Sequence, residues 1–347
     1  MRVIHAGHHV RTTTARRNVT ETGRPLREAA WLAPGGVLTA AEASELPRFQ
    51  SGFPPQHVLL TLIGEYGLHV DDPIPSASLV LILGEFGITH AGARAAIARL
   101  ARRGILVSTR SGRHTAYAMT DRCAWMVAEG RRLTLEFTGA MRSWDGRWTL
   151  VSYSIAQERR AQRALLRTRL RWLGFAPLQD GLWISPRPPS QMLQEALADL
   201  GVGSCAVFVA DPVPGPGRLE PLAAWDLDEA RDAYAAFIDE FRPVSQDLRR
   251  GRVSASEALI ARTRLTYRWF AFANSQTELP PALLPADWPG AAARELFEEL
   301  YNGLGPLAAL RIAQHIGVHD TALAASVTSF GCTEAIDDVT LARRPRR

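Results

Sequence analysis

The sequence predicts an α+β protein with three folded parts: an N-terminal winged helix-turn-helix, a central ferredoxin-like α/β domain and a helical C-terminal domain. Three observations favour this fold class. Residues 54–137 follow the order helix, helix, turn, helix, hairpin, which is that of a winged helix-turn-helix. Residues 144–211 alternate strand-like and helix-like runs. Residues 222–330 are mostly helical and follow a Pro/Gly-rich linker at 212–217.

In the first part, an apolar helix-like run covers 56–64. We expect Ser76 or Ser78 to cap a second helix, because serine side chains accept hydrogen bonds from helix N-termini. A third helix over 89–103, with Thr89 at the N-cap position, has the apolar residues Ala93, Ile97 and Leu100 at helical spacing on its inner side. Two β-like runs within 105–119, joined by a basic Gly-containing tip, predict a hairpin, or wing. A further helix is expected after it, as far as residue 137.

Charge is concentrated in this part of the chain. The 347 residues carry a net charge of +5, and all 40 basic residues are arginine because the sequence has no lysine. Residues 86–120 contain six arginines and no aspartate or glutamate. Such a stretch on a helix and wing is typical of DNA contact, with a solvated basic face as the alternative.

We therefore predict that the third helix, its N-cap and the wing contact double-stranded DNA, with one further contact from the second helix. Small residues on the third helix would let its backbone approach the major groove while arginine reaches a base edge or a phosphate. The residues assigned to DNA contact are Ser78, Thr89, His90, Arg94, Ala95, Ala98, Arg99, Arg102, Arg103, Arg110, Arg113 and His114.

The central part is predicted to hold strands at 147–155, 178–185 and 204–209 and helices at 158–173 and 191–200. This alternation indicates a small ferredoxin-like sandwich.

The C-terminal part is predicted to be a helical dimerisation and ligand-sensing domain. Its helices are expected at 228–241, 254–274 and 291–303, with a Pro-rich break at 280–289. Both chain ends are basic: residues 1–53 read as a flexible arm and 331–347 as a tail. Two interpretations fit the arm: it attracts DNA phosphates, or it is a solvated tail without a binding function.

Bulk features exclude several classes of protein. The three cysteines, Cys123, Cys205 and Cys332, lie far apart and form no CxxC pair, which argues against a disulfide scaffold and a structural zinc site. We expect buried, reduced thiols. No apolar run approaches the ~18 residues that span a bilayer, and the N-terminus lacks the apolar core of a secretory signal. The sequence therefore predicts a cytoplasmic protein without a membrane partner.

The sequence contains few of the residue patterns that enzyme active sites need. The first central strand ends in Tyr153, Ser154 and Ile155, without the carboxylate that a metal-dependent nuclease of this fold needs. His315 and His319 are four apart but lack the glutamate of HExxH, so we interpret them as surface or capping residues. We predict no enzyme, no metal and no cofactor. A nucleic-acid-processing or CoA-thioester-processing enzyme and a scaffold that does not bind DNA are the alternatives.

A series of motifs occurs in order across residues 54–315. They are GI at 87–88, ARAA at 93–96, ARLARRG at 98–104, WDGRW at 144–148, GF at 174–175, GLW at 181–183, SP at 185–186, WDL at 225–227, LPPALLPADWPG at 279–290, LF at 296–297 and LY at 300–301. In combination, these motifs resemble the PaaX-type transcriptional repressors of phenylacetate catabolism.

The resemblance implies a winged-helix reading head, a middle domain similar to a small CRISPR-adaptation nuclease and a helical C-terminal domain. It also implies a homodimer on a palindromic operator, released by an aryl-CoA thioester such as phenylacetyl-CoA. Arg94 and Arg99 match recognition-helix positions. An aryl-CoA ligand needs aromatic side chains for its acyl end and arginine for its phosphates. Candidates are Trp144, Trp183, Arg160, Arg163 and Arg167, for which core packing and a solvated helix face are the alternatives.

Overall fold

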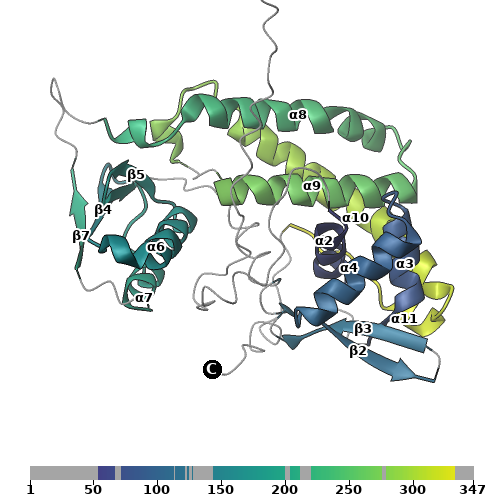
Figure 1. Cartoon of the computed structure of the whole chain (residues 1–347). Coiled ribbons are helices and arrows are strands. Elements are labelled where there is room, and N and C mark those ends of the chain that lie inside the picture. Colours follow the sequence, from purple (N-terminus) through teal and green to yellow (C-terminus); the bar gives the residue numbers. More distant parts are fainter. Residues whose placement is uncertain are drawn as a thin grey trace, which may run out of the picture.

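The computed structural model describes residues 54–66, 72–112, 114–121, 123, 124, 127, 144–199, 204–211, 220–275 and 279–332 (Figure 1). The predicted basic arm, nearly all of the basic tail and most of the helix expected after the hairpin lie outside the described residues. We refer to the described residues before 128 as the reading head.

The reading head has the order of a winged helix-turn-helix. Its elements are α2 (Pro55–Tyr66), β1 (Ile74–Pro75), α3 (Ser76–Gly84), α4 (His90–Arg102), β2 (Leu106–Ser111) and β3 (His114–Met119). The three strands form an antiparallel sheet in the order β1-β3-β2. The two-residue strand β1 was not predicted from the sequence. Pro75 fits there because β1 is an edge strand, where a missing backbone N–H is tolerated.

Local sequence explains where α3 and α4 begin. The Thr89 hydroxyl accepts a hydrogen bond from the Gly92 amide at 3.2 Å, so Thr89 is the predicted N-cap of α4. The expected serine cap of α3 is wrong. Its N-cap is Pro75, which makes no side-chain capping bond, and Ser76 is already the first helical residue.

The central part contains β4 (Trp148–Tyr153), α6 (Arg160–Trp172), β5 (Ala176–Gln179), β6 (Leu182–Ser185), α7 (Gln191–Asp199) and β7 (Cys205–Ala210), with a 3₁₀ turn, η1 (Gln157–Arg159), before α6. The sheet is antiparallel in the order β5-β6-β4-β7, as in ferredoxin-like folds. The single strand predicted at 178–185 is wrong. The chain turns there at Gly181, whose φ of +74° suits glycine, and a hairpin results.

The C-terminal part is helical: α8 (Leu227–Arg249), α9 (Ala255–Ser275), α10 (Gly290–Gly317) and α11 (Thr321–Ala325), with 3₁₀ turns η2 (Pro221–Ala224) and η3 (Pro281–Leu283). Helices α8 and α10 are longer than predicted because they continue through Pro243 and Pro306. Proline removes one helical hydrogen bond, but buried residues on both sides of Pro306, such as Leu304 and Ala308, hold α10 together by packing. No described helix is long and apolar enough to cross a membrane.

The reading head and the C-terminal helices share one hydrophobic core. Leu59 of α2 and Leu83 of α3 belong to the same buried cluster as Trp269 of α9 and Phe297 of α10. The Trp269 and Phe297 rings stack with their centroids 4.5 Å apart. Figure 1 shows α2 and α3 lying against α9, α10 and α11. The central part has its own smaller core.

A buried cation lies where the reading head meets the C-terminal helices. Arg262 of α9 is fully buried. Its Nη1 atom lies 2.8 Å from the Glu65 carboxylate and 3.1 Å from the Tyr66 hydroxyl, both in α2. Nε and Nη2 donate to the carbonyl oxygens of Tyr301 and Phe330 at 3.1 and 2.8 Å. The guanidinium also lies 4.1 Å from the Tyr301 ring centroid. The C-terminal end of α2 and internal positions of α9 and α10 therefore converge on one charge.

We predict that Arg262→Ala destabilises the protein by about 3–5 kcal/mol, because Glu65 would remain buried without its cation. Urea denaturation followed by tryptophan fluorescence measures this loss. The control is Arg264→Ala, also on α9, whose 64% exposed side chain pairs with Glu240. It should cost less than about 1 kcal/mol. Equal effects of the two substitutions would contradict the role given to Arg262.

Candidate nucleic-acid interface

The outer face of α4 is exposed and carries arginines interleaved with small residues. Arg94, Ala95, Ala98, Arg99 and Arg102 are all exposed. They recur at intervals of three to four residues, so they share one side of the helix.

The opposite side of α4 is the one that holds the helix in place. Ala93, Ala96, Ile97 and Leu100 are buried. Packing of this stripe leaves the outer face free to meet a partner. Figure 1 shows α4 directly above the β2–β3 hairpin at the lower right of the molecule.

The N-terminus of α4 and the wing extend this surface. Thr89 and His90 are exposed at the start of α4, where the free backbone amides and the helix dipole favour an anion. In the wing, Arg110 and His114 are exposed, and the chain reverses at Gly112 with φ of +60°. Arg113 lies outside the described residues.

Two residues assigned to DNA contact from the sequence are placed differently. Ser78 is fully buried, because α3 packs against both α4 and α10. That assignment is wrong for this conformation, since a buried hydroxyl cannot reach a nucleic acid. Arg103 is the C-cap of α4 and is half-buried.

A carboxylate that was not singled out from the sequence borders this surface. Glu85 lies in the turn between α3 and α4, and its side chain is only 10% exposed. Its carboxylate faces α10, where it meets Arg311 and His315. The interpretation of His315 as a surface or capping residue is therefore wrong, because its side chain is only 14% exposed and joins the Glu85–Arg311 ion pair. The sequence pattern gives no sign of this contact, because Arg311 and His315 lie more than 200 positions after Glu85 in the chain.

The arginine face of α6, a candidate for ligand phosphates, is partly used within the central domain. Arg163 donates to the Ile155 carbonyl at 2.6 Å, and Arg167 donates to Asp180 at 3.0 Å. These bonds tie α6 to the end of β4 and to the turn before β6. Arg160 is exposed.

The two candidate aromatic residues also have structural neighbours. Trp183 is 2% exposed within the central core, and the Arg171 guanidinium lies 5.4 Å from its ring centroid. Because Trp183 is buried, its assignment to ligand contact does not hold for this conformation. The Trp144 indole donates to the Arg147 carbonyl at 2.8 Å and packs edge-on against Trp148.

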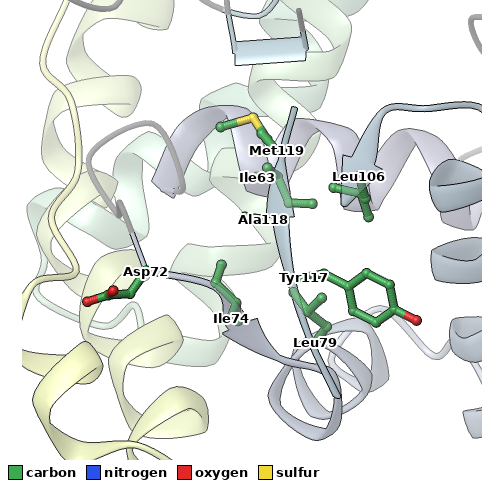
Figure 2. Close-up of a pocket in the computed structure, with 8 residues that line it drawn as sticks. All are labelled: Ile63, Asp72, Ile74, Leu79, Leu106, Tyr117, Ala118 and Met119. Carbon is green, nitrogen blue, oxygen red and sulfur yellow. The ribbon is translucent and has the colours of Figure 1, made fainter. Parts of the chain in front are cut away.

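A small cavity lies inside the reading head (Figure 2). Its volume is about 10 Å³, with Ile63, Leu79 and Leu106 among its apolar lining and Asp72 on one side. A volume of that size holds one water molecule. It has no room for a CoA thioester.

Comparison with protein families gives three matches in chain order. The model described as "PaaX-like protein" matches residues 55–123. "PaaX protein central Cas2-like domain" matches residues 141–220, and "PaaX-like protein C-terminal domain" matches residues 225–314. These matches agree with the predicted fold class: a helical head with a small sheet, a central α/β domain and a helical C-terminal domain.

Among curated proteins, the chain is similar to the transcriptional repressor PaaX of Escherichia coli strain K12. The two are 27% identical over 263 residues, covering 72% of this chain and 80% of the relative. That relative is a repressor and not an enzyme, in agreement with the prediction from the sequence. The uncharacterized protein Rv0674 from Mycobacterium tuberculosis overlaps with a TM-score of 0.47 at 22% identity, covering 72% of this chain and 92% of the other. Three matches to successive parts of one family, in the same order, show that the chain belongs to the PaaX-like protein family.

Proposed function

We propose that this chain represses transcription by reading double-stranded DNA with α4 and the β2–β3 wing. One observation carries the proposal: the outer face of α4 presents Arg94, Arg99 and Arg102 with no carboxylate among them, while its inner face is buried. A helix held in this way presents the same side chains to every DNA segment that it meets. Family membership and the repressor relative support the same function.

The chemistry of the surface suits the major groove. Ala95 and Ala98 add little bulk, so the backbone of α4 can approach the base edges. Arg94, in the N-terminal half of the helix, would reach a guanine edge or a phosphate, and Arg110 of the wing the adjacent backbone. Because neutralised phosphates release counterions, binding weakens as salt rises.

We propose a homodimer formed through the edge strand β7. Three consecutive apolar residues of β7 are exposed: Val207 at 37%, Phe208 at 56% and Val209 at 41%. Strand β7 lies at the end of the central sheet, at the left edge of Figure 1, and among the described strands it pairs with β4 alone. A second copy adding its own β7 antiparallel would satisfy the open backbone groups and cover both apolar patches about a twofold axis.

We further propose that an aryl-CoA thioester releases the repressor from an operon for degradation of an aromatic acid such as phenylacetate. The support is the family resemblance. Such a ligand must bind the DNA-free conformation more tightly than the DNA-bound one, since equal affinity shifts no equilibrium.

The first test uses a DNA duplex that the full-length protein enriches from a random-sequence pool. We predict that Arg94→Ala weakens binding to this duplex by about 5- to 150-fold, because a base-edge or phosphate contact is worth about 1–3 kcal/mol. Gel-shift titration measures the loss. Arg264→Ala, which removes an equal charge from α9, is the control and should bind normally. Unchanged affinity of Arg94→Ala would contradict the role of α4.

The dimer surface is tested with Phe208→Asp. Two buried aspartates facing each other across the proposed β7–β7 contact would repel and lose hydration, so the protein should sediment as a monomer. Val318→Asp is the matched control, since Val318 is an exposed apolar residue, 65% accessible, at the end of α10. It should sediment as the wild type does. A dimer that survives Phe208→Asp would place the interface elsewhere.

Release is tested by adding phenylacetyl-CoA to the protein–DNA complex. We predict that the apparent dissociation constant for DNA rises at least about tenfold at saturating ligand, which corresponds to about 1.4 kcal/mol of coupling. Free CoA and acetyl-CoA are the controls, because neither carries an aryl group. Fluorescence anisotropy of labelled DNA measures the change, and equal affinity with and without phenylacetyl-CoA would contradict its role as the effector.

A further inference from the structure

The turn of the helix-turn-helix is held by the C-terminal helices. Glu85 directly follows α3, and α4 begins five residues later at His90. The Glu85 Oε1 atom accepts a hydrogen bond from Arg311 Nε at 2.8 Å and lies 2.7 Å from His315 Nε2, both on α10. Its other oxygen accepts the Ser256 hydroxyl of α9. One carboxylate thus joins the turn to two helices from the far end of the chain.

This contact is shielded from solvent. The side chains of Glu85, His315 and Arg311 are 10%, 14% and 31% exposed. Burial raises the pKa of Glu85, but hydrogen bonds from Ser256, Arg311 and His315 outweigh that effect and lower it. Glu85 is therefore ionised at neutral pH. A shielded, charge-assisted contact of this kind is stronger and more directional than an exposed ion pair.

The local helix-turn-helix does not need Glu85. Helix α4 is capped by Thr89, and backbone bonds from Phe86 and Gly87 to the end of α3 close the turn. Gly87 has a φ of +70°, which lets the chain reverse there. Since the turn and both its helices have their own support, the Glu85 contacts act on the placement of the motif rather than on its formation.

We propose that Glu85, Ser256, Arg311 and His315 form a clamp that fixes the direction of α4 relative to α10. The inference rests on the proposed function in one respect: in a dimer, the direction of α4 sets the distance between the two recognition helices. Half-site spacing on DNA follows that distance. Glu85 is thus a positioning residue, which contacts no DNA itself.

The clamp is tested first without DNA, by pulsed electron spin resonance between labels at Ala91→Cys on α4 and Leu310→Cys on α10, both exposed positions. The background carries Cys205→Ser and Cys332→Ser, and labelled protein is diluted with unlabelled protein so that each dimer contributes one pair. Cys123 stays in place, since burial raises its pKa to about 12 and keeps the thiol unreactive.

Glu85→Gln is expected to broaden or shift this distance distribution relative to the wild type. The matched control is Glu299→Gln, an identical change on α10 at a carboxylate that pairs with Arg249 of α8 and not with the reading head. It should leave the distribution unchanged. Should Glu85→Gln fail to fold, Ser256→Ala removes one bond of the clamp and should produce a smaller broadening. An unchanged distribution in the folded variants overturns the clamp.

The second arm uses the duplex enriched by the wild-type protein, with one or two base pairs inserted or deleted between half-sites. The wild type should lose at least about tenfold in affinity per inserted base pair, since each rotates the half-sites apart. Glu85→Gln should bind the best duplex about 5- to 10-fold more weakly and vary less than about threefold across the series. Equal spacing profiles for variant and wild type overturn the clamp. Failure of the wild type to enrich any duplex would instead overturn the proposed function, and the spin-label distances would still decide on the clamp.

Discussion

The docking of the reading head depends on one buried charge. Taking a guanidinium out of water costs several kcal/mol unless a counter-charge and hydrogen-bond acceptors surround it. Around Arg262, Glu65 supplies the counter-charge, Tyr66 a hydroxyl, and Tyr301 and Phe330 carbonyl oxygens. These groups come from two helices, α2 and α10, and from a segment after α11. Because a displaced helix would leave the charge unpaired, this contact favours the observed arrangement of α2 against α9 and α10. The shared apolar core and this charge together hold α2 against the C-terminal helices, whereas the proposed clamp at Glu85 acts on the direction of α4.

Arginine has two separate uses in this lysine-free chain. On α4 and the wing, Arg94, Arg99 and Arg110 are exposed to solvent. On α6 and α9, Arg163 and Arg262 donate to carbonyl oxygens and carboxylates inside the protein. The planar guanidinium suits both uses, since it binds a phosphate or a carbonyl with the same donors. The number of arginines therefore says little about nucleic-acid binding, whereas their exposure on one helix face says much.

Sequence patterns predicted those elements whose formation depends on residues close together in the chain. The apolar stripe of Ala93, Ile97 and Leu100 predicted the position of α4, and Thr89 predicted its N-cap. The same reasoning missed the two-residue strand β1 and merged β5 with β6, because neither is long enough to show a period of two. It also ended α10 too early, since Pro306 usually breaks a helix and only tertiary packing keeps this one intact. The contacts of Glu85 and Arg262 were beyond reach for another reason. The partners of Glu85 lie between 171 and 230 positions away in the sequence, and those of Arg262 lie up to 197 positions away. No local pattern encodes such pairs.

The position of Phe330 has a consequence for how the protein is made. Arg262 needs the carbonyl of Phe330, and the clamp needs α10, so the reading head meets these partners only after about 200 further residues have been made. Domains emerge from the ribosome N-terminus first, at about 5–20 residues per second. For some ten seconds or more, a nascent chain carries a reading head whose docking surface is not yet made. A chain cut short before α10 would keep the arginines of α4 and lack the helix that, in the proposed clamp, fixes the direction of α4. The placement of the reading head against α9 and α10 is thus acquired only after the residues up to Phe330 have been made.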